Sequence, residues 1–171
     1  MAASLRRSVS YPASPDDVVA AVTSHEFLLA RHRPQGTAAH PRDQMRDERR
    51  LVQVVEVDEY ARTLTGTDRG KTEQAVTTYE WDLAARRCRW QYRGPHGERV
   101  RIGGEFRVGP AAGGCELESE FHVSVDYPLV GRLIEKRVLA DIQEGLSGFD
   151  RLVHEAVAAR VAAPPPLRRK R

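Results

Sequence analysis

A regular alternation of apolar and polar residues between positions 74 and 126, followed by one long amphipathic segment, constrains the fold of this chain more than any other feature. Over four successive stretches every second residue is apolar or small, which is the period of a β-strand with one buried and one solvated face. The pattern predicts an antiparallel meander that covers something on one side only. The residues expected on the buried face are Ala75, Thr77, Tyr79, Trp81, Leu83, Cys88, Trp90, Tyr92, Val100, Ile102, Gly104, Phe106, Val108, Cys115, Leu117, Ser119, Phe121, Val123 and Val125.

Three further strands are predicted from shorter signals. Residues 4–11 form a first strand, which Pro12 ends. Residues 51–57 and 60–67 are β-branched runs, and we expect a tight hairpin turn at residues 58–59 between them. With the meander, these segments predict seven strands in all.

The segments between these strands carry weaker patterns. Residues 34–50 are polar and lack a clear period, so we expect an irregular connection there. The chain is expected to turn again over residues 67–70. Gly103 and Gly104 lie inside a predicted strand, which indicates a bulge or a sharp bend at that point.

Two short helices are predicted between the first and second strands. Ser14 is a good N-cap, and Pro15 suits the first helical position, where no backbone N–H is needed. Ser24 can cap a second short helix over residues 25–32, with Phe27 and Leu28 on its buried side.

A long C-terminal helix is predicted from Tyr127-Pro128 to about Ala162. Its apolar residues recur at steps of three and four, which places them on one stripe facing the sheet. They are Val130, Ile134, Val138, Ile142, Leu146, Phe149, Leu152, Val153, Ala156 and Val157. A run of prolines over residues 164–166 ends the helix.

This order of elements, with the strand-to-helix phrases at residues 11–15 and 127–135, resembles the START-like or SRPBCC superfamily and especially its uncharacterised bacterial branch. The resemblance covers the chain apart from its two tails. It implies an α+β helix-grip fold, in which a seven-stranded curved antiparallel sheet wraps a long C-terminal helix and two short helices lie between strands 1 and 2. It also implies a cavity between sheet and helix that accepts a lipid, a sterol, a polyketide or another apolar molecule.

Length and charge limit the number of domains and the kinds of partner that the chain can have. The 171 residues suit one domain, which we place at residues 1–163, followed by a disordered Pro-rich basic tail at residues 164–171. That tail carries four of the 27 Lys and Arg residues, so the folded part is near neutral and lacks the basic face that nucleic acid requires. The tail is read either as a solubilising end or as a weak contact with an anionic membrane. No apolar run is long enough for an export signal or a membrane helix, so we expect a cytoplasmic protein.

The walls of the implied cavity are the candidate ligand-binding residues. They are Tyr79, Trp81, Trp90, Tyr92, Phe106, Phe121, Leu146 and Phe149. The alternative is that these side chains simply meet and fill the core. The apolar face carries no Asp, Glu or His, so we assign no catalytic residue.

No cofactor and no metal ion are predicted. Cys88 and Cys115 are too far apart for a metal knuckle and are expected to be buried thiols. A site built from His25, Glu26 and His32 is disfavoured, because the two histidines are two helical turns apart.

Three functions remain open from the sequence. The first is a carrier or sensor that binds an apolar small molecule without chemistry of its own. The second is an enzyme of the polyketide cyclase or aromatase kind, in which Tyr79 or Tyr92 acts with a histidine at the cavity mouth. The third is a protein-interaction module, although no obligate protein partner is inferred.

Overall fold

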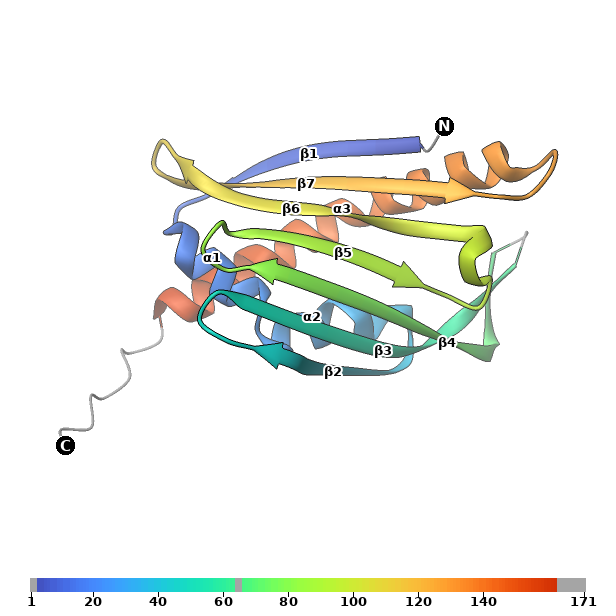
Figure 1. The fold of residues 1–171 in the computed structure, drawn as a ribbon, viewed down its shortest axis with the longest axis horizontal. Coiled ribbons are helices and arrows are strands. Elements are labelled where there is room, and N and C mark those ends of the chain that lie inside the picture. The colour runs from blue at the N-terminus through green and yellow to red at the C-terminus, as the bar shows by residue number, and fades with distance from the viewer. Residues whose placement is uncertain (1–2, 64–65, 163–171) are drawn as a thin grey trace.

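The computed structural model describes residues 3–63 and 66–162 and shows a curved sheet wrapped against one long helix (Figure 1). The sheet is antiparallel, with seven strands in the order β1-β7-β6-β5-β4-β3-β2. The predicted α+β helix-grip fold is therefore confirmed. Its elements are β1 (Ala3–Tyr11), α1 (Pro15–Val22), α2 (His25–His32), the 3-10 turn η1 (Arg33–Gln35), β2 (Gly36–Arg46), β3 (Arg50–Thr63), β4 (Gly66–Asp82), β5 (Arg87–Arg93), the 3-10 turn η2 (Gly97–Arg99), β6 (Val100–Ala111), β7 (Gly114–Val125) and α3 (Gly131–Ala162).

The two short helices begin where their serine caps predict. The Ser14 hydroxyl accepts a hydrogen bond from the Asp17 backbone N–H at 3.1 Å, and Ser24 does the same for the Phe27 N–H at 3.1 Å. Each cap satisfies one of the N–H groups that a helix N-terminus leaves without a partner. Both helices lie on the concave side of the sheet, beside α3 (Figure 1).

The expectation of an irregular connection over residues 34–50 is wrong. Most of this segment is β2, which pairs with β3 from Gly36 opposite Glu59 to Arg46 opposite Leu51. The strand lies at one edge of the sheet, so it needs a partner on one side only and tolerates polar residues and Pro41. Its weak sequence pattern is the pattern of an edge strand.

The hairpin predicted at residues 58–59 is also wrong, because β3 continues through this point. Asp58 pairs with Gln74 and Glu59 with Glu73 on β4. The turn expected over residues 67–70 lies inside β4, where the register shifts after Tyr60 and leaves residues 69–71 without partners on β3. The residues that favour a turn thus form a bulge within the long strand β4.

Gly103 and Gly104 do not form the expected bulge. The pairing of β6 with both β5 and β7 runs through them without a register shift. Gly104 is instead a point of close approach, since an added Cβ would collide with the Glu120 carbonyl oxygen and lie 3.0 Å from the Trp90 indole nitrogen.

The long helix α3 begins at Gly131, a turn later than its predicted start at Pro128. Its buried residues after Gly131 are Leu146 at the middle of the helix and Val153 and Val157 in its C-terminal half. The helix packs against the sheet and α1. Residues 163–171 lie outside the described residues, and with them the predicted tail and its membrane contact. No helix in the described ranges has the length and apolarity that crossing a membrane requires.

Three polar contacts tie the α1–α2 region to the neighbouring strands. The buried Gln53 side chain on β3 donates to the Thr23 carbonyl, between the two helices, at 2.9 Å. It also donates to the Asp43 carboxylate on β2 at 2.9 Å, and that carboxylate contacts the His25 ring at 2.9 Å. These contacts hold the N-terminal end of α2 over the concave face.

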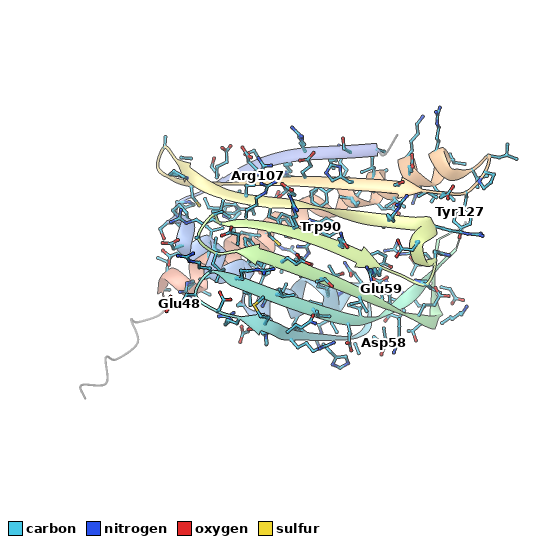
Figure 2. All side chains as sticks on the ribbon, in the orientation of Figure 1. Glu48, Asp58, Glu59, Trp90, Arg107 and Tyr127 are labelled. Atoms are coloured by element: carbon cyan, nitrogen blue, oxygen red, sulfur yellow. The ribbon has the colours of Figure 1, made fainter. Side chains whose placement is uncertain are left out.

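The convex face of the sheet is polar. Glu105 on β6 pairs with Arg87 at 2.7 Å and with Arg107 at 3.0 Å, and Arg107 lies on this face in Figure 2. This solvated charge network leaves the concave face as the apolar side, as the alternation predicts.

Candidate functional site

A cluster of aromatic rings occupies the middle of the concave face. Trp90 and Phe106 are nearly parallel, with ring centroids 6.1 Å apart, and Phe121 meets them edge-on at 5.7 and 6.4 Å. Phe149 from α3 stacks on Phe106 at 5.9 Å, which joins the helix to the sheet. Trp90 lies near the centre of the sheet in Figure 2. The register brings these rings together, because Gly104 stands between Trp90 and Phe121 and leaves room for both.

Arg31 on α2 reaches into this cluster. Its guanidinium carbon lies 5.5 Å from the ring centroid of Tyr79, 5.9 Å from Trp90, 5.3 Å from Phe106 and 4.8 Å from Phe149. A cation within about 6 Å of an aromatic face is attracted by the electron-rich face of the ring. Four rings at this distance therefore make a cage for the guanidinium.

The space left in the cluster is small. The structure has a cavity of about 10 Å³ there, which is roughly the room that one water molecule needs. We call this cavity with its walls the chamber. The chamber is lined by Val22, Phe27, Leu28, Arg31, Tyr79, Trp81, Phe106, Leu117 and Phe149. The interior is thus more nearly filled than a ligand-sized cavity would be, and the Arg31 side chain contributes to the filling.

Most of the predicted wall residues meet at this place. Tyr79, Trp81, Phe106 and Phe149 line the chamber, and Trp90 faces Arg31. Phe121 and Leu146 belong to the same buried cluster without lining the chamber.

Tyr92 is the predicted wall residue whose polar group points elsewhere. Its hydroxyl donates to the Glu59 carboxylate at 2.7 Å. Burial raises the pKa of Tyr92 and also that of Glu59. The Tyr92 hydroxyl is therefore already hydrogen-bonded to Glu59, a residue of the sheet.

A buried hydrogen-bonded chain lies beside the chamber. The Nε2 atom of His32 is 2.8 Å from the Tyr79 hydroxyl, and its Nδ1 atom is 3.1 Å from the Gln35 side-chain oxygen. Since that oxygen can only accept, we assign the ring proton to Nδ1, which leaves Nε2 to accept the Tyr79 proton. Burial, and after it the charge of Arg31, lower the pKa of His32 to about 4. Burial raises the pKa of Tyr79 to about 12, so both groups are neutral at neutral pH.

Sequence reasoning missed Arg31. The available signal was spacing, because Arg31 follows Phe27 by four residues and Leu28 by three and so lies on the same face of α2. An arginine on an otherwise buried helical face is unusual enough to single out.

A second arginine enters the interior from β1. Arg7 pairs with Asp150 on α3, and Tyr11 lies in the same region, with its ring centroid 4.5 Å from that of His154 and the two rings tilted by 51°. The buried Tyr11 hydroxyl has no hydrogen-bond partner in the described chain, and burial raises its pKa. The Arg7–Asp150 ion pair joins β1 to α3, and we interpret it as a contact that supports the fold.

Metal and thiol chemistry have little support in this region. Within residues 3–63 and 66–162, no three His, Cys, Asp or Glu side chains come together as a metal site would require. Cys88 and Cys115 are buried, as expected, and burial raises the pKa of both thiols, which keeps them protonated.

Comparison with known families places this chain. The model of a family described as "Protein of unknown function (DUF2505)" matches residues 6–156. The chain belongs to this family. A comparison with curated proteins finds no match.

Solved structures confirm the fold. The protein TTHA0849 from Thermus thermophilus is 20% identical, with 94% of this chain and 100% of that chain covered and a TM-score of 0.64. The ZhuI aromatase/cyclase from Streptomyces sp. R1128 is 16% identical, with 95% and 98% covered and a TM-score of 0.65. A START superfamily protein from Mycobacterium smegmatis is 14% identical, with 91% and 97% covered and a TM-score of 0.54. At these identities the likeness establishes the START-like fold.

Proposed function

We propose that this DUF2505 protein binds an apolar small molecule, such as a lipid or a polyketide, between the concave face of its sheet and α3, as a carrier or sensor. The observation that carries the proposal is the cage of rings around Arg31. A core that served stability alone would fill its centre with apolar side chains, because a guanidinium loses hydration there and needs a partner to compensate. The chamber is instead filled by a long, flexible side chain from a short helix.

Binding requires the chamber to open, since its present volume of about 10 Å³ holds no ligand. We propose that Arg31 swings out, with or without a displacement of α2. The rings would then present an apolar surface of the kind that lines small-molecule sites. The aromatase/cyclase with the same fold is consistent with such a use of the interior.

The first test uses a neutral apolar fluorophore, N-phenyl-1-naphthylamine. We expect saturable binding of one molecule per chain, weakened about tenfold by Phe149→Ala, which removes a ring from the chamber. The control is Leu133→Ser on α3, because Leu133 is 71% exposed and lies outside the chamber, so its loss should not change binding. Native mass spectrometry of freshly purified protein would reveal a co-purifying ligand.

Two results would count against ligand binding in the chamber. One is the absence of saturable binding together with the absence of any co-purifying species. The other is binding that Leu133→Ser removes and Phe149→Ala leaves intact, because the dye would then be held at the surface.

The buried His32–Tyr79 hydrogen bond supports a second candidate, an enzyme of the cyclase or aromatase kind that uses the same chamber. Tyr79 lines the chamber and its hydroxyl donates a hydrogen bond to His32, so a phenol and an imidazole, two groups that can serve in general acid–base catalysis, lie in contact beside the place a substrate would occupy. With a reactive poly-β-ketone as substrate, Tyr79→Phe is expected to lower the cyclisation rate about a hundredfold. Tyr92→Phe is the matched control, since the Tyr92 hydroxyl is directed to Glu59, and equal rates in both variants would exclude Tyr79 from catalysis.

A further inference from the structure

Among the described residues, the guanidinium of Arg31 has no counter-ion. The side chain is half-buried, and no Asp or Glu among the described residues forms an ion pair or a hydrogen bond with it. Arg7, the other arginine that reaches the interior, has Asp150 as its partner. The difference matters, because a partly desolvated cation is stabilised mainly by an anion close to it.

The walls of the chamber cannot supply that anion. Apart from Arg31, the lining residues are Val, Leu, Phe, Tyr and Trp side chains, none of which is acidic. The positive charge of Arg31 acts on a neighbouring side chain, since it is one of the causes that lower the pKa of His32. The chamber is therefore an apolar space whose lining carries one positive charge and no negative charge.

In the described part of the chain, a second buried hydrogen-bond donor in the ring cluster also lacks an acceptor. The indole N–H of Trp90 is buried, with the residue 6% exposed, and has no hydrogen-bond partner among the described residues. An unpaired buried donor costs about 1–3 kcal/mol, so such groups are uncommon and call for an explanation. The centroid of the Trp90 ring lies 5.9 Å from the guanidinium carbon of Arg31, and the indole nitrogen itself lies beside Gly104.

We propose that the ligand carries an anionic oxygen, a carboxylate or a phenolate, on a flat apolar body, and that this oxygen pairs with Arg31 while the body lies against the rings. This inference rests on the proposed binding function and adds the chemical class of the ligand. Arg31 then has two roles: it fills the chamber when the ligand is absent and provides the counter-ion when the ligand is bound.

A cationic ligand is the competing class, because a cage of rings also suits a quaternary ammonium group. Such a ligand would find no carboxylate in the chamber lining to pair with. Repulsion from the resident guanidinium would oppose its entry. The observations thus favour an anion.

The test compares three probes of similar shape at neutral pH: 2-naphthoate, the neutral 2-naphthamide and the cation trimethyl(2-naphthyl)ammonium. Titration calorimetry should show that 2-naphthoate binds roughly tenfold more tightly than the amide and that the cation binds most weakly. Arg31→Met keeps the length of the side chain and removes its charge, so it should abolish the preference for naphthoate while the amide still binds. Arg31→Lys should restore part of the preference.

Arg33→Met is the matched control, since it removes the same charge from an exposed residue two positions away. It should leave the preference for naphthoate unchanged. If the amide and naphthoate bind equally and Arg31→Met has no effect, the anionic class is overturned and the binding function stands. Tighter binding of the cation, increased further in Arg31→Met, would overturn it in favour of a cationic ligand. If none of the three probes binds while N-phenyl-1-naphthylamine does, the anionic class is overturned and the binding function stands.

Discussion

Gly104→Ala is expected to lower the free energy of unfolding by about 3 kcal/mol or more, a larger effect than a single methyl group normally has. The added Cβ would collide with the backbone carbonyl of Glu120 on β7 and crowd the Trp90 indole on β5. The Glu120 carbonyl belongs to the backbone and cannot rotate away as a side chain can. β6 and β7 would therefore have to separate at the centre of the sheet. For a domain of this size, the midpoint of thermal unfolding should fall by about 10 °C.

Gly109→Ala provides the matched control on the same strand. An added Cβ at Gly109 meets nothing within 4 Å, so this variant should stay within about 0.5 kcal/mol of the parent protein. Urea unfolding followed by tryptophan fluorescence measures both variants. Equal midpoints for the two would contradict the close approach of β7 to Gly104.

The second large effect is a loss of stability between pH 6.5 and pH 4, caused by His32. Because burial holds the pKa of His32 at about 4 in the folded protein, against about 6.5 in the unfolded chain, the unfolded state takes up a proton first as the pH falls. The stabilisation is fully present above the unfolded pKa and is lost as the pH drops towards the folded pKa. At 1.36 kcal/mol per pH unit, the loss amounts to about 2 kcal/mol by pH 5 and about 3 kcal/mol by pH 4.

Urea unfolding at a series of pH values, on the parent protein and on His32→Gln, isolates this contribution. The difference in unfolding free energy between the two proteins should shrink steadily as the pH falls from 6.5. The ring-proton chemical shift of His32 gives the pKa directly. A difference that stays constant down to pH 5 would contradict a neutral, buried His32.

Much of the fold could be predicted because its signals are local. The alternation around Tyr79, Trp90 and Phe106 fixes which face of each strand is buried, and Ser14 and Ser24 fix where the short helices begin. β2 could not be found this way, since an edge strand buries little and its period is weak. The false hairpin at residues 58–59 arose because an acidic pair resembles a turn, whereas Glu59 is accommodated in the strand by the distant Tyr92.

The candidate site was only partly predictable. The rings were expected to share a face, and they do, because register follows from alternation. The position of Arg31 depends on how α2 lies across the sheet, and a tertiary arrangement of that kind leaves no mark in the spacing of the strands. The hydrogen bond between His32 and Tyr79 joins residues 47 positions apart and likewise depends on how α2 packs.

The tethers that hold α2 have a consequence for kinetics. Any occupant of the chamber lies behind a helix fastened through Gln53 to Thr23 and through Asp43 to His25. If release requires these contacts to break, the residence time of a bound molecule is set by local unfolding of this corner and has a steep temperature dependence. Loading and unloading of the proposed ligand would then be slow steps.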